Sequence, residues 1–191
     1  MAVLAEWLTG GDEVPRLTKG PLTVKFEKKW AKKLGTKYSV FVNSGSSAIL
    51  LMLYALKTSG RLKNDKIIVP SLSWVTDVSS VMQLGLQPIL CDSNMEDLSV
   101  DLGHLEELFI KETPTCLLLV TVLGLVPDMT KIVELCDKYD VTLLEDTCES
   151  MGSKFKGDYL GTAGLMSCFS LYYGHHLSTI EGGLINTDDK E

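Results

Sequence analysis

The sequence predicts an α/β fold in which helices cover both faces of a mainly parallel sheet. Short runs rich in strand formers alternate with helix-length segments between residues 21 and 146. Several predicted strands, such as 115–122, are apolar at consecutive positions, which is typical of strands buried on both faces. Right-handed crossovers through the intervening helices make such strands parallel.

The first half of the chain contains three predicted strands and three predicted helices. In the charged segment 21–34, apolar residues recur at helical spacing, and Gly35 is expected to end that helix. The further elements are a strand at 38–42, a turn at 43–47, a buried helix at 48–56, a strand at 66–71, a helix at 74–85 and a strand at 87–92.

The second half continues the alternation. It contains a predicted helix at 101–109, a strand at 115–122, a helix at 128–140 with Asp128 as its N-cap, and a strand at 141–146. The segment 167–191 is again rich in strand formers. We expect one domain, since no internal repeat or low-complexity linker is visible and 191 residues can enclose one substantial core.

Composition excludes several classes of protein. The net charge of -7, without a long basic tract, argues against nucleic acid as a general partner. No apolar run has the roughly 18 residues of a membrane span, and no signal peptide is visible. The five cysteines are odd in number and form no CxxC pair, so we expect reduced core thiols in a cytoplasmic protein.

The segment NSGSSA, residues 43–48, is the first candidate binding motif. Its small residues, including Gly45 and Ser46, allow backbone N–H groups to approach an anion where the next helix begins. A phosphate suits that arrangement. A simple helix cap is the alternative, and the motif alone does not decide between them.

Two strand ends supply further candidates. Strand 141–146 delivers Asp146 to the sheet edge, with Glu149 shortly after it, and Trp74 follows strand 66–71. A buried acid at this edge needs a partner, and a protonated pyridine nitrogen is one; a Trp face could stack on the same ring. A helix cap for Asp146 and core packing for Trp74 are the alternatives.

The segment FSLYYGHHLSTIEGG, residues 169–183, contains Ser170 and the adjacent His175 and His176. No spaced set of Cys or carboxylate ligands accompanies the histidines, so we predict no metal site. Proton transfer is the better interpretation, because imidazole titrates near neutral pH. Two solvated loop histidines remain the alternative.

Taken in order, five segments carry a family resemblance: LTKGPLTVKFEKKWAKKLG, VNSGSSAILL, VPSLSWVTDVSSV, LLEDTCESMGSKFKGDYLGT and SCFSLYYGHHLSTIEGG. Together they resemble the sugar aminotransferases among the fold type I pyridoxal phosphate enzymes. The resemblance implies an aspartate-aminotransferase-like large domain that binds the cofactor over residues 1–191. It also implies truncation, because family members are about twice as long and have a smaller C-terminal domain absent from this sequence.

One position departs from that family. A lysine that holds pyridoxal phosphate as a Schiff base is expected five residues after the phosphate-binding serine, where this sequence has His175. Imidazole cannot form that bond. A His in this setting is similar to the 3-dehydratase branch of the family, which uses pyridoxamine 5′-phosphate. The implied function is 3-dehydration of a nucleotide-linked 4-keto-6-deoxyhexose, and His175 is the implied base.

The resemblance also implies roles for the other candidates. Asp146 would keep the pyridine nitrogen protonated, Trp74 would stack on the ring, and Glu149 would lie near the ring hydroxyl. The phosphate would be bound by Gly45, Ser46 and Ser170. His176 is assigned to the neighbouring structure.

The implied partners are a nucleotide-linked keto sugar, glutamate as candidate amino donor, and either a second copy in a homodimer or a complementing C-terminal polypeptide. Two alternatives stay open. One is a pyridoxal phosphate-dependent sugar aminotransferase, against which the missing lysine argues. The other is a truncated, split or noncatalytic remnant, which the length suggests.

Overall fold

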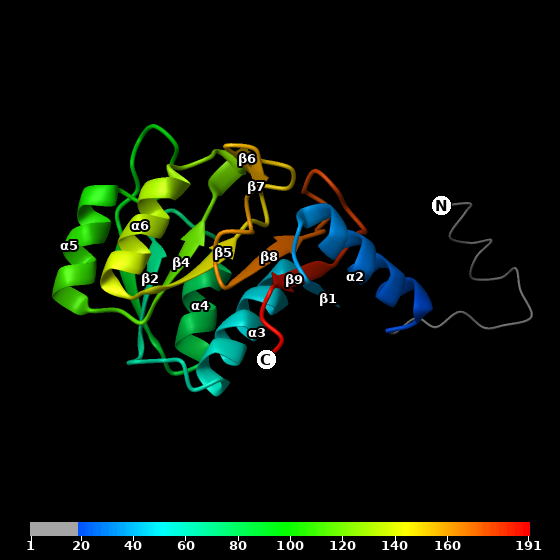
Figure 1. Cartoon of the computed structure of the whole chain (residues 1–191), viewed down its shortest axis with the longest axis horizontal. Coiled ribbons are helices and arrows are strands. Elements are labelled where there is room, and N and C mark those ends of the chain that lie inside the picture. Colours follow the sequence, from blue (N-terminus) through cyan, green and yellow to red (C-terminus); the bar gives the residue numbers. More distant parts are fainter. Residues whose placement is uncertain (1–18) are drawn as a thin grey trace, which may run out of the picture.

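A computed structural model of the chain describes residues 19–191, which form a seven-stranded sheet and a separate two-stranded hairpin (Figure 1). The strand order in the sheet is β1-β9-β8-β5-β4-β2-β3. These strands are β1 (Tyr38–Val42), β2 (Lys66–Pro70), β3 (Gln87–Cys91), β4 (Cys116–Val120), β5 (Thr142–Asp146), β8 (Met166–Ser170) and β9 (Gly183–Thr187). The hairpin consists of β6 (Lys154–Phe155) and β7 (Asp158–Tyr159).

Helices cover both faces of the sheet, as the sequence predicts (Figure 1). They are α2 (Pro21–Leu34), α3 (Gly45–Thr58), α4 (Val75–Gln83), α5 (Leu102–Glu112) and α6 (Met129–Tyr139), with a 3₁₀ turn η1 at Val122–Gly124. Strand β4 shows how one strand serves two cores. Leu117 and Leu119 pack with α5 and α6, whereas Leu118 packs with α3 and α4, because successive side chains point to opposite faces.

The direction of the strands brings their carboxyl ends to one edge. Strand β5 is parallel to both β4 and β8, so Asp146 lies in register with Val120 on one side and Cys168 on the other. Strand β9 is the exception in the main sheet, since it runs antiparallel between β1 and β8. The prediction of a mainly parallel sheet is therefore confirmed, with one reversed strand made possible by the hairpin connection from β8.

Several boundaries match the predictions, and one expectation is wrong. Gly35 ends α2 in the left-handed conformation, and the Asp128 side chain caps α6 by accepting the N–H of Lys131. The apolar segment 48–56, however, is not buried on all sides. It belongs to a longer helix that begins at Gly45, and Leu51 and Tyr54 on its outer face are exposed. The helix contacts the sheet on one face only, which hydrophobic composition does not show.

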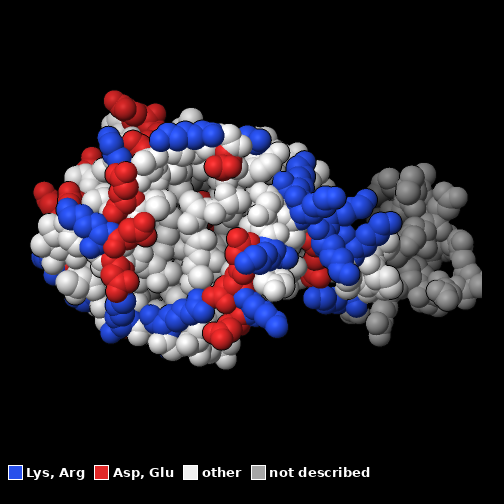
Figure 2. All heavy atoms as spheres, in the orientation of Figure 1, with Lys and Arg blue, Asp and Glu red and all other residues white. Residues whose placement is uncertain are grey.

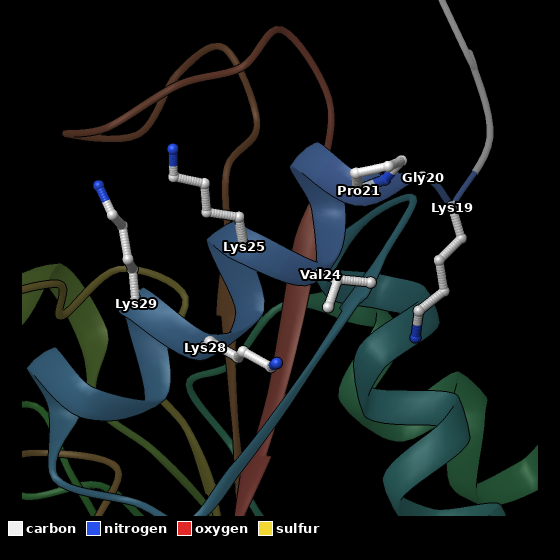
Figure 3. Close-up of a pocket in the computed structure, with 7 residues that line it drawn as sticks. All are labelled: Lys19, Gly20, Pro21, Val24, Lys25, Lys28 and Lys29. Carbon is white, nitrogen blue, oxygen red and sulfur yellow. The ribbon is translucent and has the colours of Figure 1, made fainter.

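Helix α2 concentrates basic charge although the whole chain is acidic (Figure 2). A shallow hollow beside its first turns is lined by Lys19, Gly20, Pro21, Val24, Lys25, Lys28 and Lys29, and Lys25 and Lys29 extend in the same direction because they are one turn apart (Figure 3). Basic residues are thus clustered on this helix. Within residues 19–191, no helix has both the length and the apolar character to cross a bilayer.

Candidate active site

A cavity of about 720 Å³ opens at the carboxyl edge of the parallel strands. Its size falls within the range of small-molecule sites. Strand and helix ends far apart in the sequence contribute its walls. It brings together all seven predicted site residues: Gly45, Ser46, Trp74, Asp146, Glu149, Ser170 and His175.

One wall of the cavity is the N-terminus of α3. Ser44 caps the helix, since its hydroxyl accepts the N–H of Ser47 at 3.1 Å. Gly45 and Ser46 occupy the first turn, where backbone N–H groups have no acceptor within the helix. These donors and the helix dipole favour an anion. The helix therefore begins within the NSGSSA motif, and Ser44 of that motif is its cap, whereas anion binding by the first turn stays a prediction.

Gly45 is required by the packing at this wall. A Cβ atom there would lie 2.8 Å from Ser170 Cβ and 2.8 Å from Cys148 Sγ, closer than atoms can approach. Ser170 ends β8 and is buried, and its hydroxyl accepts the N–H of Tyr172 at 3.2 Å. The start of α3 thus packs directly against the end of β8, and Gly45 and Ser170 line the cavity side by side.

The cavity is also lined by Asp146, the last residue of β5, which is 3% exposed. Its Oδ1 accepts the backbone N–H of Cys148 at 2.9 Å and contacts the thiol of Cys168 at 3.4 Å. Among the described residues, no Lys, Arg or His forms an ion pair with Asp146. A buried carboxylate without a cation suits a ligand that supplies a positively charged N–H, such as a protonated pyridine.

Trp74 lies directly before α4, and its side chain is 63% exposed where it lines the cavity. The alternative of a Trp buried in the core is therefore wrong. Its backbone is fixed by a reciprocal pair of hydrogen bonds, because Trp74 N donates to Asp77 Oδ2 at 3.1 Å and Trp74 O accepts the N–H of Asp77 at 3.0 Å. The indole is available to cover a flat ligand from a fixed backbone.

The two adjacent histidines lie in different surroundings. His175 is half-buried and lines the cavity, whereas His176 is exposed and does not. The N–H of His175 donates to Tyr172 O at 3.0 Å, and the Tyr172 and His175 rings meet edge to face with centroids 5.7 Å apart. The loop between β8 and β9 therefore turns His175 toward the cavity. Among described residues lining the cavity there is no lysine.

Glu149 is half-buried, and its Oε2 accepts the N–H of Leu123 at 2.7 Å. Leu123 belongs to η1 and has a positive φ of 54°, an unusual conformation for leucine. The carboxylate thus holds the turn after β4 at the cavity wall. Its predicted contact with a ring hydroxyl stays a prediction.

Two residues beside Asp146 were not among those predicted from the sequence. Asp77 is fully buried, and burial, together with the nearby carboxyl of Asp146, raises its pKa to about 9. The three-residue spacing from Trp74 to an acid, typical of a capping box, was the available signal. Cys148 lines the cavity 3.8 Å from Cys168, measured between the sulfur atoms. Hydrogen bonding from Cys168 lowers the pKa of Cys148, but burial and Asp146 raise it to about 12, so the thiol is neutral at neutral pH.

Comparison with known proteins gives a consistent set of relatives. Residues 6–191 match the model of the DegT/DnrJ/EryC1/StrS aminotransferase family. The chain is 41% identical to the GDP-4-keto-6-deoxy-D-mannose 3-dehydratase of Escherichia coli O55:H7 (strain CB9615 / EPEC), over 91% of this chain and 45% of that protein. It is 35% identical to the GDP-perosamine synthase of Escherichia coli O157:H7, over 91% of this chain and 46% of the relative.

A solved structure of GDP-4-keto-6-deoxymannose-3-dehydratase with a trapped PLP-glutamate geminal diamine matches the fold with a TM-score of 0.85. It is 40% identical to this chain, and the match covers 90% of this chain and 45% of that one. The expected fold type I architecture is therefore confirmed. The chain spans about half the length of the relatives it matches. It belongs to the DegT/DnrJ/EryC1/StrS aminotransferase family.

Proposed function

We propose that this chain is the cofactor-binding large domain of a pyridoxamine 5′-phosphate-dependent enzyme that removes the 3-hydroxyl group from a nucleotide-linked 4-keto-6-deoxyhexose. One observation carries the proposal: a half-buried imidazole, His175, lines the cavity, and none of its described lining residues is a lysine. The 41% identity to a GDP-4-keto-6-deoxy-D-mannose 3-dehydratase supports the same reaction class. Glutamate is the proposed amino donor, because a solved relative contains a trapped PLP-glutamate adduct.

The cavity residues fit each part of such a cofactor. The first turn of α3 and Ser170 offer donors to its phosphate, the buried carboxylate of Asp146 accepts an N–H from its ring nitrogen, and the indole of Trp74 covers its ring. When bound, the cofactor supplies an amine that can condense with a keto group and a ring that accepts electrons. Asp146 supports that role by keeping the ring nitrogen protonated.

His175 is the proposed proton-transfer group. A neutral imidazole nitrogen accepts a proton from the carbon next to the cofactor ring and can return a proton to the departing hydroxyl. A lysine at the same place would compete for the cofactor covalently. The edge-to-face contact with Tyr172 and the bond from the His175 backbone to Tyr172 O restrict the position of the imidazole, which proton transfer requires.

The test is His175→Asn, with His176→Asn as the matched control on the exposed neighbour. Turnover is measured with GDP-4-keto-6-deoxymannose, pyridoxamine phosphate and glutamate, with the C-terminal region of the E. coli relative supplied as a second polypeptide. We expect His175→Asn to lower turnover by at least about 100-fold, the usual contribution of a general acid–base group, while binding of pyridoxamine phosphate changes little. Equal loss in both variants, or undiminished turnover in His175→Asn, contradicts the proposal.

Transamination of a keto sugar is the second candidate, and the 35% identity to a GDP-perosamine synthase favours it. Product analysis separates the two reactions, because transamination leaves the 3-hydroxyl in place and adds an amino group. We further propose a homodimer or a complementing polypeptide, since apolar side chains on α3 and α4, such as Leu51, Tyr54 and Met82, are exposed. The five unpaired cysteines support a cytoplasmic location.

A further inference from the structure

We propose that Asp77 is a positioning residue of this site: its carboxyl group carries a proton that it shares with Asp146, so that Asp146 alone bears the negative charge presented to a bound ring. The role of Asp77 in cofactor binding rests on the proposed function. The shared proton, in contrast, is a property of the ligand-free chain.

The geometry places two carboxyl groups together in a buried space. Asp77, in the first turn of α4, has no exposed surface, and its carboxyl group lies within hydrogen-bonding reach of that of Asp146. Asp77 Oδ2 accepts the N–H of Trp74, whereas Oδ1 is buried and receives no hydrogen bond from any described residue. An acceptor-only carboxylate in that position would leave Oδ1 unsatisfied; a protonated carboxyl group can donate to Asp146.

Electrostatics require that one of the two acids keeps its proton. The titratable groups that face Asp77 are Asp146 on β5, Cys148 and Glu149 after it, and Cys168 on β8. None of these supplies a positive charge, and two adjacent buried carboxylates repel each other strongly.

The proton belongs on Asp77. Its ionised form would have one N–H donor, from Trp74, whereas Asp146 has the N–H of Cys148 and the Cys168 thiol, and it reaches the cavity. Burial and the neighbouring Asp146 raise the pKa of Asp77 to about 9, in agreement with this assignment.

The pair connects two groups that would hold the ring. One oxygen of Asp77 accepts the backbone N–H of Trp74, which would cover the ring face, and the protonated oxygen would donate to the carboxylate of Asp146, which would bind the ring nitrogen. Because the pair carries one negative charge and not two, it matches the single positive charge of a protonated pyridine. Asp77 therefore acts through Asp146 and Trp74, without touching the ligand.

The first measurement is the pH dependence of thermal unfolding of the ligand-free chain. Because the folded pKa of Asp77 lies above its ordinary value of 3.8, its contribution to stability is fully present below pH 3.8 and is lost as the pH rises toward 9. Asp77→Asn, which cannot ionise, removes this loss, so its Tm should fall less than that of the wild type between pH 4 and 9. Asp128→Asn, at the N-cap of α6, is the control and should follow the wild type.

The second measurement is titration with pyridoxamine phosphate at pH 7, followed by absorbance. Asparagine can donate to Asp146 and accept from Trp74 N, so Asp77→Asn should bind within a few-fold of wild type. Asp77→Ala removes both bonds and should weaken binding by about tenfold or more.

Parallel pH profiles for wild type and Asp77→Asn would overturn the shared proton. Equal weakening by Asn and Ala, or no weakening by Ala, would overturn the positioning role. If the wild type itself binds no pyridoxamine phosphate, the proposed function and this role fail, while the pH profiles still decide on the proton.

Discussion

Replacing Gly45 with alanine tests the proposed phosphate site with a single methyl group. The added Cβ would lie 2.8 Å from Ser170 Cβ, 2.8 Å from Cys148 Sγ and 3.2 Å from Ser170 Oγ. Carbon atoms normally approach to about 3.5–4.0 Å, so the start of α3 and the end of β8 must separate by several tenths of an ångström. That displacement acts on the donors that the proposed site offers to a phosphate.

Two effects of opposite sign set the change in stability. Overpacking a closely packed site costs about 1–3 kcal/mol. Alanine at a helical position recovers up to about 1 kcal/mol relative to glycine, by helix propensity and by a less flexible unfolded chain. The net expectation is a destabilisation of about 0–3 kcal/mol. The affinity for pyridoxamine phosphate should fall more than the free energy of unfolding, because the residues that move are the ones that would contact the phosphate.

The assay combines urea unfolding with absorbance titration of pyridoxamine phosphate. Gly103→Ala is the matched control: it lies in the first turn of α5, away from the cavity, and its Cβ would meet only the Asp101 side chain, at 3.3 Å. We expect Gly45→Ala to weaken binding of pyridoxamine phosphate by at least about tenfold, since one or more charge-assisted hydrogen bonds would be lost. Unchanged binding in Gly45→Ala would refute the assignment of this turn as the phosphate site.

Three further changes test the fold around the site. Gly183→Ala places a Cβ against the carbonyl of Ser44, a backbone obstacle, so it should destabilise the chain more than Gly45→Ala in urea unfolding; a smaller loss contradicts the close contact. Glu145→Gln should cost about 1–3 kcal/mol, because the buried carboxylate accepts three backbone N–H groups at 2.7–2.8 Å and an amide nitrogen cannot accept; full stability would show that the loop adapts. Leu118→Ala, at the fully buried centre of β4, should lower the free energy of unfolding by about 2–5 kcal/mol. A loss below about 1 kcal/mol would mean that neighbouring side chains fill the space left by the leucine.

Features that depend on the local pattern of residues could be predicted from the sequence. Consecutive apolar residues in β4 and β5 indicated buried parallel strands, and the position of Asp146 after such a strand indicated the carboxyl edge. The strand order, which the sequence does not give, then brings the ends of β5 and β8 and the start of α3 around one cavity in the structure. Spacing within the family-like motif distinguished His175 from His176, and the structure gives these two residues different exposure.

The features that were missed depend on contacts between distant segments. Asp77 looks like an ordinary helix-capping acid in sequence, and only the packing of α4 against the end of β5 buries it beside Asp146. The exposed apolar side chains Leu51 and Tyr54 could not be separated from core residues by composition. The reversal of β9 follows from its hairpin connection to β8, which strand propensity does not encode.

Borohydride reduction of the chain mixed with pyridoxal phosphate shows whether any residue of the cavity holds the cofactor covalently. Peptide mass analysis then locates any pyridoxyl group fixed to the protein. We expect the cofactor to perturb the absorbance spectrum without becoming fixed to any residue of the cavity, and we expect His175→Lys to gain an adduct at position 175. A pyridoxyl group fixed to a cavity residue of the wild type, or no spectral change with either form of the cofactor, would contradict this expectation.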